Sequence, residues 1–148
     1  MGRGTNLAVF LAALTGCVAR EMLPTRGVRP DQPTCIVDAL LRYHGDDWYC
    51  VTVTIQNNAA EPIALNSSRF ELLAAPPCIF VPSPELSFRR GRFAMPEEVV
   101  PNGTARGELF FIARGASPRY PVEFVAHMPD GDHSFEFAKG FTTTSPAR

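Results

Sequence analysis

Alternating apolar and polar residues identify the middle of the chain as β-strand. In the stretch WYCVTVTIQN, Tyr49, Val51, Val53 and Ile55 alternate with Trp, Cys and Thr neighbours. A period of two places these four side chains on one face of a sheet, so we expect that face to be buried. The preceding stretch IVDALLRY is expected to form a second strand, joined to the first through the turn residues GDD as a β-hairpin. A helix over VDALLRY is the alternative, which the adjoining β-branched run disfavours.

Shorter strands follow, separated by turn residues. The stretch NNAAEPIALNSSRFELLAA predicts extended segments at residues 63–65 and 70–73. Between residues 76 and 101 prolines interrupt the pattern, and we expect an irregular crossing between two sheets with one brief strand at residues 79–81. Regular alternation returns in PNGTARGELFFIARG, which predicts a strand over residues 108–113.

The C-terminal part of the chain predicts another hairpin. YPVEFVAHM and HSFEFAKGF both read as strands, and the turn residues PDGD lie between them. Val122, Phe124 and Ala126 are expected on one face, with Phe135 and Phe137 on a facing one.

Composition agrees with a single domain made of short strands. The chain has 148 residues, of which 45% are hydrophobic, enough for one real core, and its 14 prolines and 11 glycines favour turns. The formal net charge of -1 gives no bulk attraction to nucleic acid, so no nucleic-acid partner is expected. Together the patterns predict an all-β fold, an antiparallel β-sandwich of about seven strands.

The N-terminal residues have the layout of an export signal. Arg3 precedes an apolar run over residues 7–14, which is too short to cross a bilayer as a helix. The residues LTGC that end at Cys17 resemble a bacterial lipobox. The resemblance implies that the Cys17 sulfur receives a diacylglyceryl group, through which the protein would be held at a membrane. An ordinary secretory signal, cut after Ala19, is the alternative.

The lipobox divides the chain into three parts. We expect a lipoprotein signal peptide over residues 1–16, a lipidated Cys and flexible tether over residues 17–33, and the β-sandwich domain over residues 34–148. The tether is predicted because this segment has several prolines and no period. Val18 stands where an Asp would favour the inner membrane by analogy with enteric sorting, so we expect the outer membrane, with the domain facing the periplasm.

Three stretches carry a family resemblance. VTVTIQNNAAEPIALNSSRFEL, EEVVPNGTARGELFFIA and YPVEFVA resemble the immunoglobulin-like domains of small exported bacterial lipoproteins. The resemblance covers residues 36–141 and implies an immunoglobulin-like sandwich, without catalytic residues to carry over. The proline-rich insert over residues 76–96 departs from the family pattern.

Three cysteines remain after Cys17. An odd number in an oxidising compartment predicts one disulfide and one free thiol. Cys35 and Cys50 would lie at opposite ends of the first hairpin, so a bridge between Cys50 and Cys78 is slightly favoured. Three reduced thiols are the alternative.

The histidines and the catalytic motifs predict little chemistry. His44, near two Asp residues, and the group His127, Asp130, Asp132 and His133 lie in or beside turns, where Asp is favoured for local hydrogen bonding. We therefore expect no metal site and no cofactor. The sequence has no G-x-S-x-G elbow, no H-E-x-x-H and no Gly-rich phosphate loop, so we expect a protein that is not an enzyme.

The stretch FRRGRF in the insert is the candidate binding element. Its residues Phe88, Arg89, Arg90 and Phe93 combine aromatic and guanidinium groups, which interfaces favour and which could also face phosphate-bearing surfaces. The alternative is a solvated loop whose phenylalanines plug the core. The expected function is a non-catalytic interaction or assembly module of the cell envelope with an envelope protein as partner. A periplasmic carrier of a small ligand or metal is the other hypothesis.

Overall fold

A computed structural model gives the fold. It describes residues 20–24, 26–28, 33–44, 48–74, 78–89, 92–113 and 121–138. The predicted signal peptide, Cys17 and Arg90 lie outside these residues. No helix among the described residues is long and apolar enough to span a membrane.

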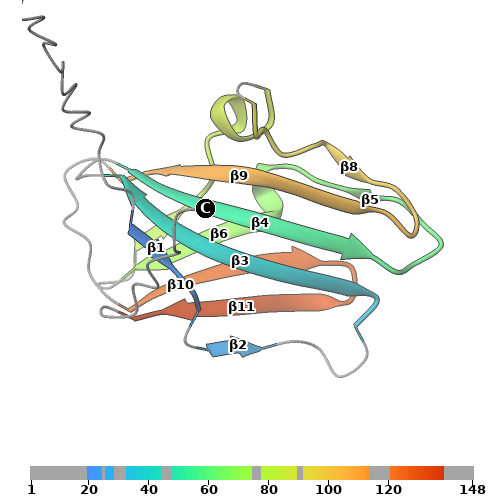
Figure 1. Cartoon of the computed structure of the whole chain (residues 1–148), viewed down its shortest axis with the longest axis horizontal. Coiled ribbons are helices and arrows are strands. Elements are labelled where there is room, and N and C mark those ends of the chain that lie inside the picture. Colours follow the sequence, from blue (N-terminus) through green and yellow to red (C-terminus); the bar gives the residue numbers. More distant parts are fainter. Residues whose placement is uncertain are drawn as a thin grey trace, which may run out of the picture.

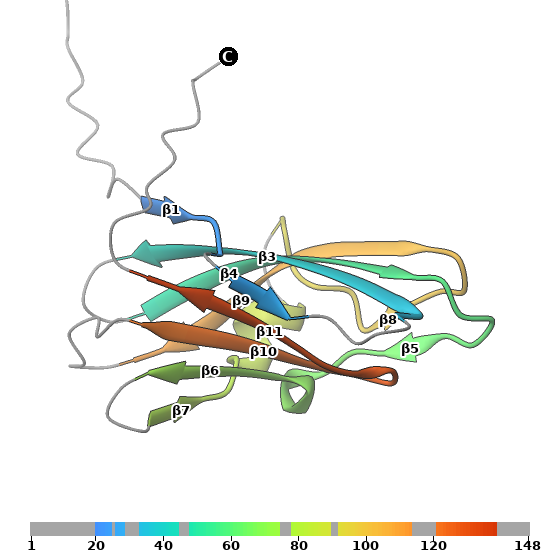
Figure 2. The ribbon, with the colours of Figure 1, turned by 90° about the horizontal axis from the view of Figure 1, so that it is seen from below.

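Two antiparallel sheets face each other (Figures 1 and 2). Sheet A has the order β1-β3-β4-β9, sheet B the order β2-β11-β10-β6-β7, and β5 and β8 form a small third sheet. The fold is the predicted all-β, immunoglobulin-like antiparallel sandwich, and its described residues form eleven strands in place of the expected seven or so. The elements are β1 (Arg20–Met22), β2 (Arg26–Val28), β3 (Cys35–His44), β4 (Trp48–Asn57), β5 (Ile63–Ala64), η1 (Ser67–Arg69), β6 (Phe70–Ala74), β7 (Cys78–Phe80), η2 (Glu85–Arg89), β8 (Glu98–Val99), β9 (Thr104–Ile112), β10 (Val122–Met128) and β11 (Gly131–Phe137).

The first predicted hairpin is confirmed as β3 and β4. The two strands pair antiparallel from Cys35–Asn57 at one end to His44–Trp48 at the other, so the helical alternative for this stretch is wrong. The four alternating apolar residues of β4 are buried and face sheet B, as the period of two predicts. Cys35 and Cys50 lie at opposite ends of the hairpin, as expected.

An aromatic cluster joins the two sheets. Phe124 of β10 packs against Phe70 of β6 with ring centroids 6.1 Å apart, and edge-on against Phe111 of β9 at 6.2 Å. Phe135 of β11 adds a fourth ring, whose centroid lies 6.2 Å from that of Phe124. All four side chains are buried. The predicted C-terminal hairpin is confirmed as β10 and β11. Its apolar residues differ from the expectation of two facing sets, because Phe124 pairs with Phe135 and Val122 with Phe137, so all of them line the same inner face.

The segment predicted to be a tether contributes strands to both sheets. β1 pairs with β3 along one edge of sheet A, and β2 pairs with β11 along one edge of sheet B. The prediction that residues 17–33 are a flexible tether therefore differs from the structure, and the sandwich begins before residue 34. Strands of three residues are too short to show a period, so the sequence pattern gave no sign of them.

Buried polar residues fasten the loops of the sandwich. Asn57, fully buried at the end of β4, donates from Nδ2 to the carbonyl oxygens of Glu61 at 2.8 Å and Val99 at 3.2 Å. Its Oδ1 accepts from the Ala59 N–H at 2.9 Å. Because both ends of the amide have partners, Asn57 can be buried without an unpaired polar group, and it ties the loop after β4 to β8.

Hydrogen bonds from the NSSRFEL stretch also connect separate strands of the sandwich. Asn66 caps η1 by accepting from the Ser68 N–H at 3.0 Å. Arg69 then donates to the carbonyl oxygens of Ala64 at 2.5 Å and His127 at 3.0 Å, which joins β5 to β10. Asn66 and Arg69, which lie in a stretch that carries the family resemblance, thus stabilise the fold.

Asp130 joins the two sheets at the end of the molecule where β3 begins. Its Oδ2 accepts from the Cys35 N–H at 2.8 Å, and its Oδ1 lies 3.0 Å from Nε2 of the buried His133. Burial alone would raise the pKa of Asp130, but the hydrogen bonds from His133 and from the Cys35 N–H outweigh it and lower the pKa. The carboxylate therefore stabilises the contact between the start of β3 and the β10–β11 turn.

The insert crosses from the edge of sheet B to the edge of sheet A, as predicted. It leaves β7, forms η2 and reaches β8 beside β9 (Figure 1). Ser83 N–H donates to the Phe110 carbonyl at 2.8 Å, and the Phe110 N–H donates to Ser87 Oγ at 3.0 Å. The insert thus takes up hydrogen-bonding groups on the free edge of β9, which would otherwise be open to pairing with another strand.

Candidate functional site

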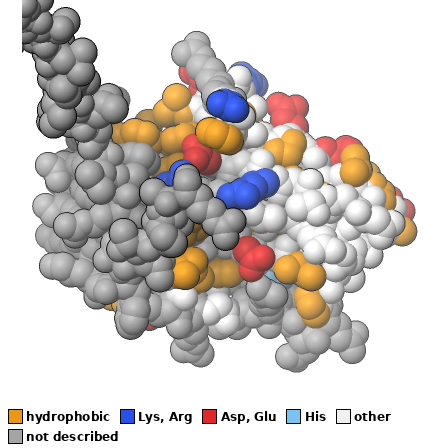
Figure 3. All heavy atoms as spheres, viewed as in Figure 1, with side chains coloured by type: hydrophobic (Ala, Val, Ile, Leu, Met, Phe, Trp, Pro, Cys, Tyr) orange, Lys and Arg blue, Asp and Glu red, His pale blue; other side chains and the backbone are white. Residues whose placement is uncertain are grey.

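A groove lies on the outer face of sheet A, beside the insert. It encloses about 410 Å³ and is lined on the sheet by Arg42, Thr52, Arg106 and Glu108, and along one side by residues 92–94. Figure 3 shows this face, where blue Lys and Arg side chains lie beside red acidic ones over β4, β9 and the insert. We call this cavity the outer-face groove. Its volume falls in the range of small-molecule sites.

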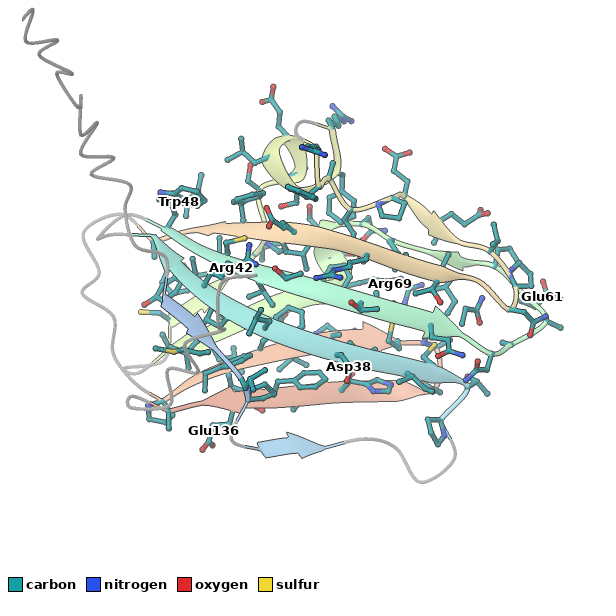
Figure 4. All side chains as sticks on the ribbon, viewed as in Figure 1. Asp38, Arg42, Trp48, Glu61, Arg69 and Glu136 are labelled. Atoms are coloured by element: carbon teal, nitrogen blue, oxygen red, sulfur yellow. The ribbon has the colours of Figure 1, made fainter. Side chains whose placement is uncertain are left out.

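The sheet residues of the groove come from three neighbouring strands. Thr52 of β4 pairs with Glu108 of β9, and Arg106 lies two residues before Glu108 on the same face. Arg42 of β3 reaches across β4, where Nη1 lies 3.1 Å from Glu108 Oε1 (Figure 4). The ion pair is only partly buried, with 28% of the Arg42 side chain and 18% of the Glu108 side chain exposed, so it adds little stability but fixes both side chains.

Thr52 carries an unusual hydroxyl. The residue is only 8% exposed, and its Oγ1 has no hydrogen-bond partner among the described residues. Since its neighbours Val51 and Val53 point into the core, the Thr52 side chain points outward into the groove. A buried hydroxyl without a partner is disfavoured, which marks this position as a place where a ligand atom could bind.

The wall of the groove is held against β9 by a glycine. A Cβ atom at Gly107 would lie 2.5 Å from Met95 Cα, so only glycine lets the insert backbone come this close. There the Glu108 N–H donates to the Phe93 carbonyl at 2.8 Å, and Ala94 forms a parallel bridge with Glu108. Phe93 is 59% exposed, and the Arg92 guanidinium lies 5.7 Å from the centre of its ring. The wall thus combines a fixed backbone with exposed aromatic and cationic groups.

The structure separates the residues of FRRGRF that the sequence grouped as a binding element. Phe88 is half-buried against the core, 6.5 Å from the Phe70 ring centroid, as the core-plug alternative expects. Phe93 is exposed and lines the groove, and Arg89 is exposed on η2 outside it. Arg90 lies outside the described residues. Binding by Phe93 and the arginines stays a prediction.

The predicted disulfide is absent from the structure, where Cys35, Cys50 and Cys78 are all free thiols. Cys50 lies on the outer face of sheet A between Arg42 and Phe110, whereas Cys78 is exposed on the edge strand β7 of sheet B. Positions along the chain do not show that the two residues belong to different sheets, which is why the sequence favoured this pairing.

Cys50 lies beside the groove as a neutral thiol. Burial, and then the negative charge of Glu108, raise its pKa to about 12, although Arg42 opposes the shift. Because the thiolate is the nucleophilic form, this shift disfavours reaction of Cys50 at neutral pH.

The histidine group is divided between the two faces of sheet B. His133 points inward to Asp130, whereas His127 points outward, with Nδ1 2.7 Å from Asp132 and Nε2 3.6 Å from Glu71. The hydrogen bond to Asp132 raises the pKa of His127 despite partial burial, and the charge of Glu71 adds to the shift. Among the described residues, no group of three or more His, Cys, Asp and Glu side chains is placed to hold a metal ion.

The sheet residues of the groove were not among the binding residues predicted from the sequence. Arg42, Thr52, Arg106 and Glu108 are far apart along the chain, and no motif joins them. The only signal available was the polar side of the period-two pattern, on which Thr52 and Thr54 look alike.

Comparison with known proteins gives a family and a fold. The family model described as "Domain of unknown function (DUF4352)" matches residues 37–133. No curated protein matches the chain in sequence. A functionally unknown protein from Listeria monocytogenes is similar in structure, with 12% identity, a TM-score of 0.53 and 71% of each chain covered. The yjhA protein from Bacillus subtilis has 14% identity and a TM-score of 0.51, over 72% of this chain and 80% of that chain. A secreted protein from Mycobacterium tuberculosis has 15% identity and a TM-score of 0.43, over 75% of this chain and 72% of that chain.

Proposed function

Since the chain belongs to the DUF4352 family of domains of unknown function, we propose its function from its own residues: a lipoprotein that acts as a non-catalytic binding module of the cell envelope. The lipid on Cys17 holds it at the membrane, with the outer membrane and a periplasm-facing domain favoured by Val18. The sandwich presents the insert to an envelope protein. Three acyl chains on Cys17 would anchor it firmly, at about 0.8 kcal/mol per buried methylene.

The observation that carries the binding role is the fixed, exposed wall of the groove. Phe93 is 59% exposed, yet its carbonyl is hydrogen-bonded to β9 and the next residue but one, Met95, is buried in the core. Met95 N–H also donates to the Ser87 carbonyl at 2.6 Å. An aromatic side chain presented on a backbone that is already ordered loses little entropy on binding, which is how interface anchors gain affinity.

A second candidate function is a periplasmic carrier of a small ligand. The volume of the outer-face groove, about 410 Å³, favours it, since this is large enough for a small molecule. The two functions differ in what occupies the groove and its wall.

Cell fractionation tests the anchor. Wild-type protein should sediment with membranes and co-migrate with the outer membrane on a density gradient, whereas Cys17→Ala should leave an uncut precursor that no longer carries lipid. A wild-type protein that is soluble and begins at Arg20 would contradict the lipobox.

Cross-linking in intact cells tests the binding module. Phe93→Ser should remove cross-linked products that the wild-type protein forms with envelope proteins. Ile79→Ser is the matched control, because Ile79 is 63% exposed but lies on β7, away from the groove. Products that persist in Phe93→Ser, or disappear equally in Ile79→Ser, would contradict a role for the wall.

A further inference from the structure

We propose that the outer-face groove binds the phosphate group of an anionic ligand through Arg106, Arg92 and the Thr52 hydroxyl. This assignment rests on the proposed binding function, whose ligand chemistry it specifies. Four observations support it: the charge of the groove, the open donor capacity of two guanidinium groups, the buried hydroxyl, and the directions from which the donors come.

The charge of the groove is positive. Arg42, Arg92 and Arg106 line it against one carboxylate, Glu108, which gives three positive charges minus one negative charge, or a net +2. A phosphate monoester carries about -1.5 to -2 at neutral pH, so one phosphate group would balance the groove.

Two of the arginines have N–H donors to offer. Arg42 is engaged with Glu108, which holds it in place. Within the described part of the chain, Arg106 has no ion pair or hydrogen bond, and the contact of Arg92 is with the ring of its neighbour Phe93. Guanidinium groups are well suited to phosphate, because their planar forks donate two parallel hydrogen bonds to its oxygens.

The Thr52 hydroxyl adds a neutral donor at the floor of the groove. It is more than nine-tenths buried and has no partner in the described structure, so a ligand oxygen would supply the hydrogen bond that it lacks. A hydroxyl that gains its first partner on binding contributes to affinity, because no existing hydrogen bond has to break.

The arrangement of the donors favours phosphate over carboxylate. Thr52 and Arg106 donate from the neighbouring strands β4 and β9, and Arg92 donates from the insert, so the donors approach from the floor of the groove and from one side. The two coplanar oxygens of a carboxylate are satisfied by one guanidinium fork. A tetrahedral phosphate has oxygens directed to several sides and can engage all three donors together.

The same chemistry has two natural sources at a membrane. The phosphate could belong to a soluble phosphate monoester or to a lipid headgroup, which is a phosphodiester. Both would bind to the same three residues, and a comparison of soluble and lipid probes distinguishes them.

Isothermal titration calorimetry on the full-length protein in detergent tests the assignment. The probes are inorganic phosphate, glycerol 3-phosphate and the short-chain lipid dihexanoyl phosphatidylglycerol, with acetate for comparison. Saturable binding of a phosphate probe is expected, with acetate much weaker. Tighter binding of glycerol 3-phosphate would assign a soluble ligand, and tighter binding of the lipid would assign a headgroup.

Three variants locate the site. Arg106→Ala should weaken phosphate binding by at least about tenfold, since it removes a charge-assisted contact. Thr52→Val should weaken it by about threefold or more, whereas Thr52→Ser should retain it. Arg89→Ala is the matched control, because it removes the same charge from an exposed position outside the groove and should change the affinity less than about twofold.

The assignment is overturned by any of three results. These are no saturable binding of any phosphate probe, equal losses in Arg89→Ala and Arg106→Ala, and acetate binding as tight as phosphate. Circular dichroism checks that each variant is folded. We expect Arg106→Ala to fold, because the Arg106 side chain is exposed. Phe93-dependent cross-linking without phosphate binding would overturn the ligand assignment and leave the proposed function standing, whereas phosphate binding without that cross-linking would do the reverse.

Discussion

Two buried polar residues of the same strand, Asn57 and Thr52, differ in whether their side chains have hydrogen-bond partners. Both lie on β4, and their exposed fractions are 0% and 8%. Asn57 points inward and its amide has partners at both ends. Thr52 points to the outer face, and its hydroxyl has none among the described residues.

The difference separates a structural polar residue from a candidate binding residue. A polar group that is buried with its hydrogen bonds made is part of the fold, and its loss is costly. A polar group that is buried without partners, in an open groove lined by arginines, makes little contribution to the fold. We therefore expect substitution of Asn57 to lower the free energy of unfolding. Substitution of Thr52 should raise the free energy of unfolding and weaken ligand binding.

The largest expected effect is at Asn57. Asn57→Ala would remove the donor from the carbonyl oxygens of Glu61 and Val99 and leave a cavity at the end of β4. We expect the free energy of unfolding to fall by about 3 kcal/mol. Urea denaturation followed by fluorescence measures this, and a loss below about 1 kcal/mol would contradict the structural role.

A smaller loss is expected at the wall of the groove. Gly107→Ala places a Cβ against Met95 Cα, so the backbone of the insert must move, at a cost of about 2 kcal/mol. Gly27→Ala is the matched control, because its Cβ would be in ordinary contact with the Phe135 ring at 3.7 Å. Equal midpoints of urea denaturation for the two variants would show that the wall is not held by this close approach.

The opposite sign is expected at Thr52. In phosphate-free buffer, Thr52→Val replaces the unpartnered hydroxyl by a methyl group of similar size and should raise the free energy of unfolding by about 1 kcal/mol. Thr54→Val, on the same face but only half-buried, should stay within about 0.5 kcal/mol of wild type. A Thr52→Val variant that is destabilised would mean that the hydroxyl serves the fold, as the Asn57 amide does.

The smallest effect concerns acid. The folded pKa of Asp130 is lower than its ordinary value, so its contribution to stability is complete above the unfolded pKa, about 3.9, and is lost as the pH falls through the folded pKa. The stability difference between wild type and Asp130→Asn should therefore shrink below about pH 4. Glu97→Gln, which removes an exposed carboxylate, is the control. A difference that stays constant from pH 6 to pH 2.5 would contradict the effect.

Much of the fold could be predicted because its signals are local. The alternation in β4 indicated which residues are buried, and the turn residues before β4 and before β11 predicted both hairpins. The short strands β1 and β2 could not be predicted, since each has three residues and is ordered only by pairing with a long neighbour. The Cys50–Cys78 pairing failed for a related reason, because sequence positions do not reveal which sheet a strand joins.

Of the candidate site, the sequence by itself determined the outward direction of Thr52 and the presence of Phe93 and arginines in an irregular insert. It could not separate Thr52 from Thr54, which occupy equivalent positions in the alternation. Only the tertiary structure decided between them. It brings Arg42 and Glu108 from two other strands, and the insert held close by Gly107, around Thr52 and not around Thr54. Periodicity fixes the face on which a side chain lies, but the surroundings on that face depend on contacts between residues far apart in the chain.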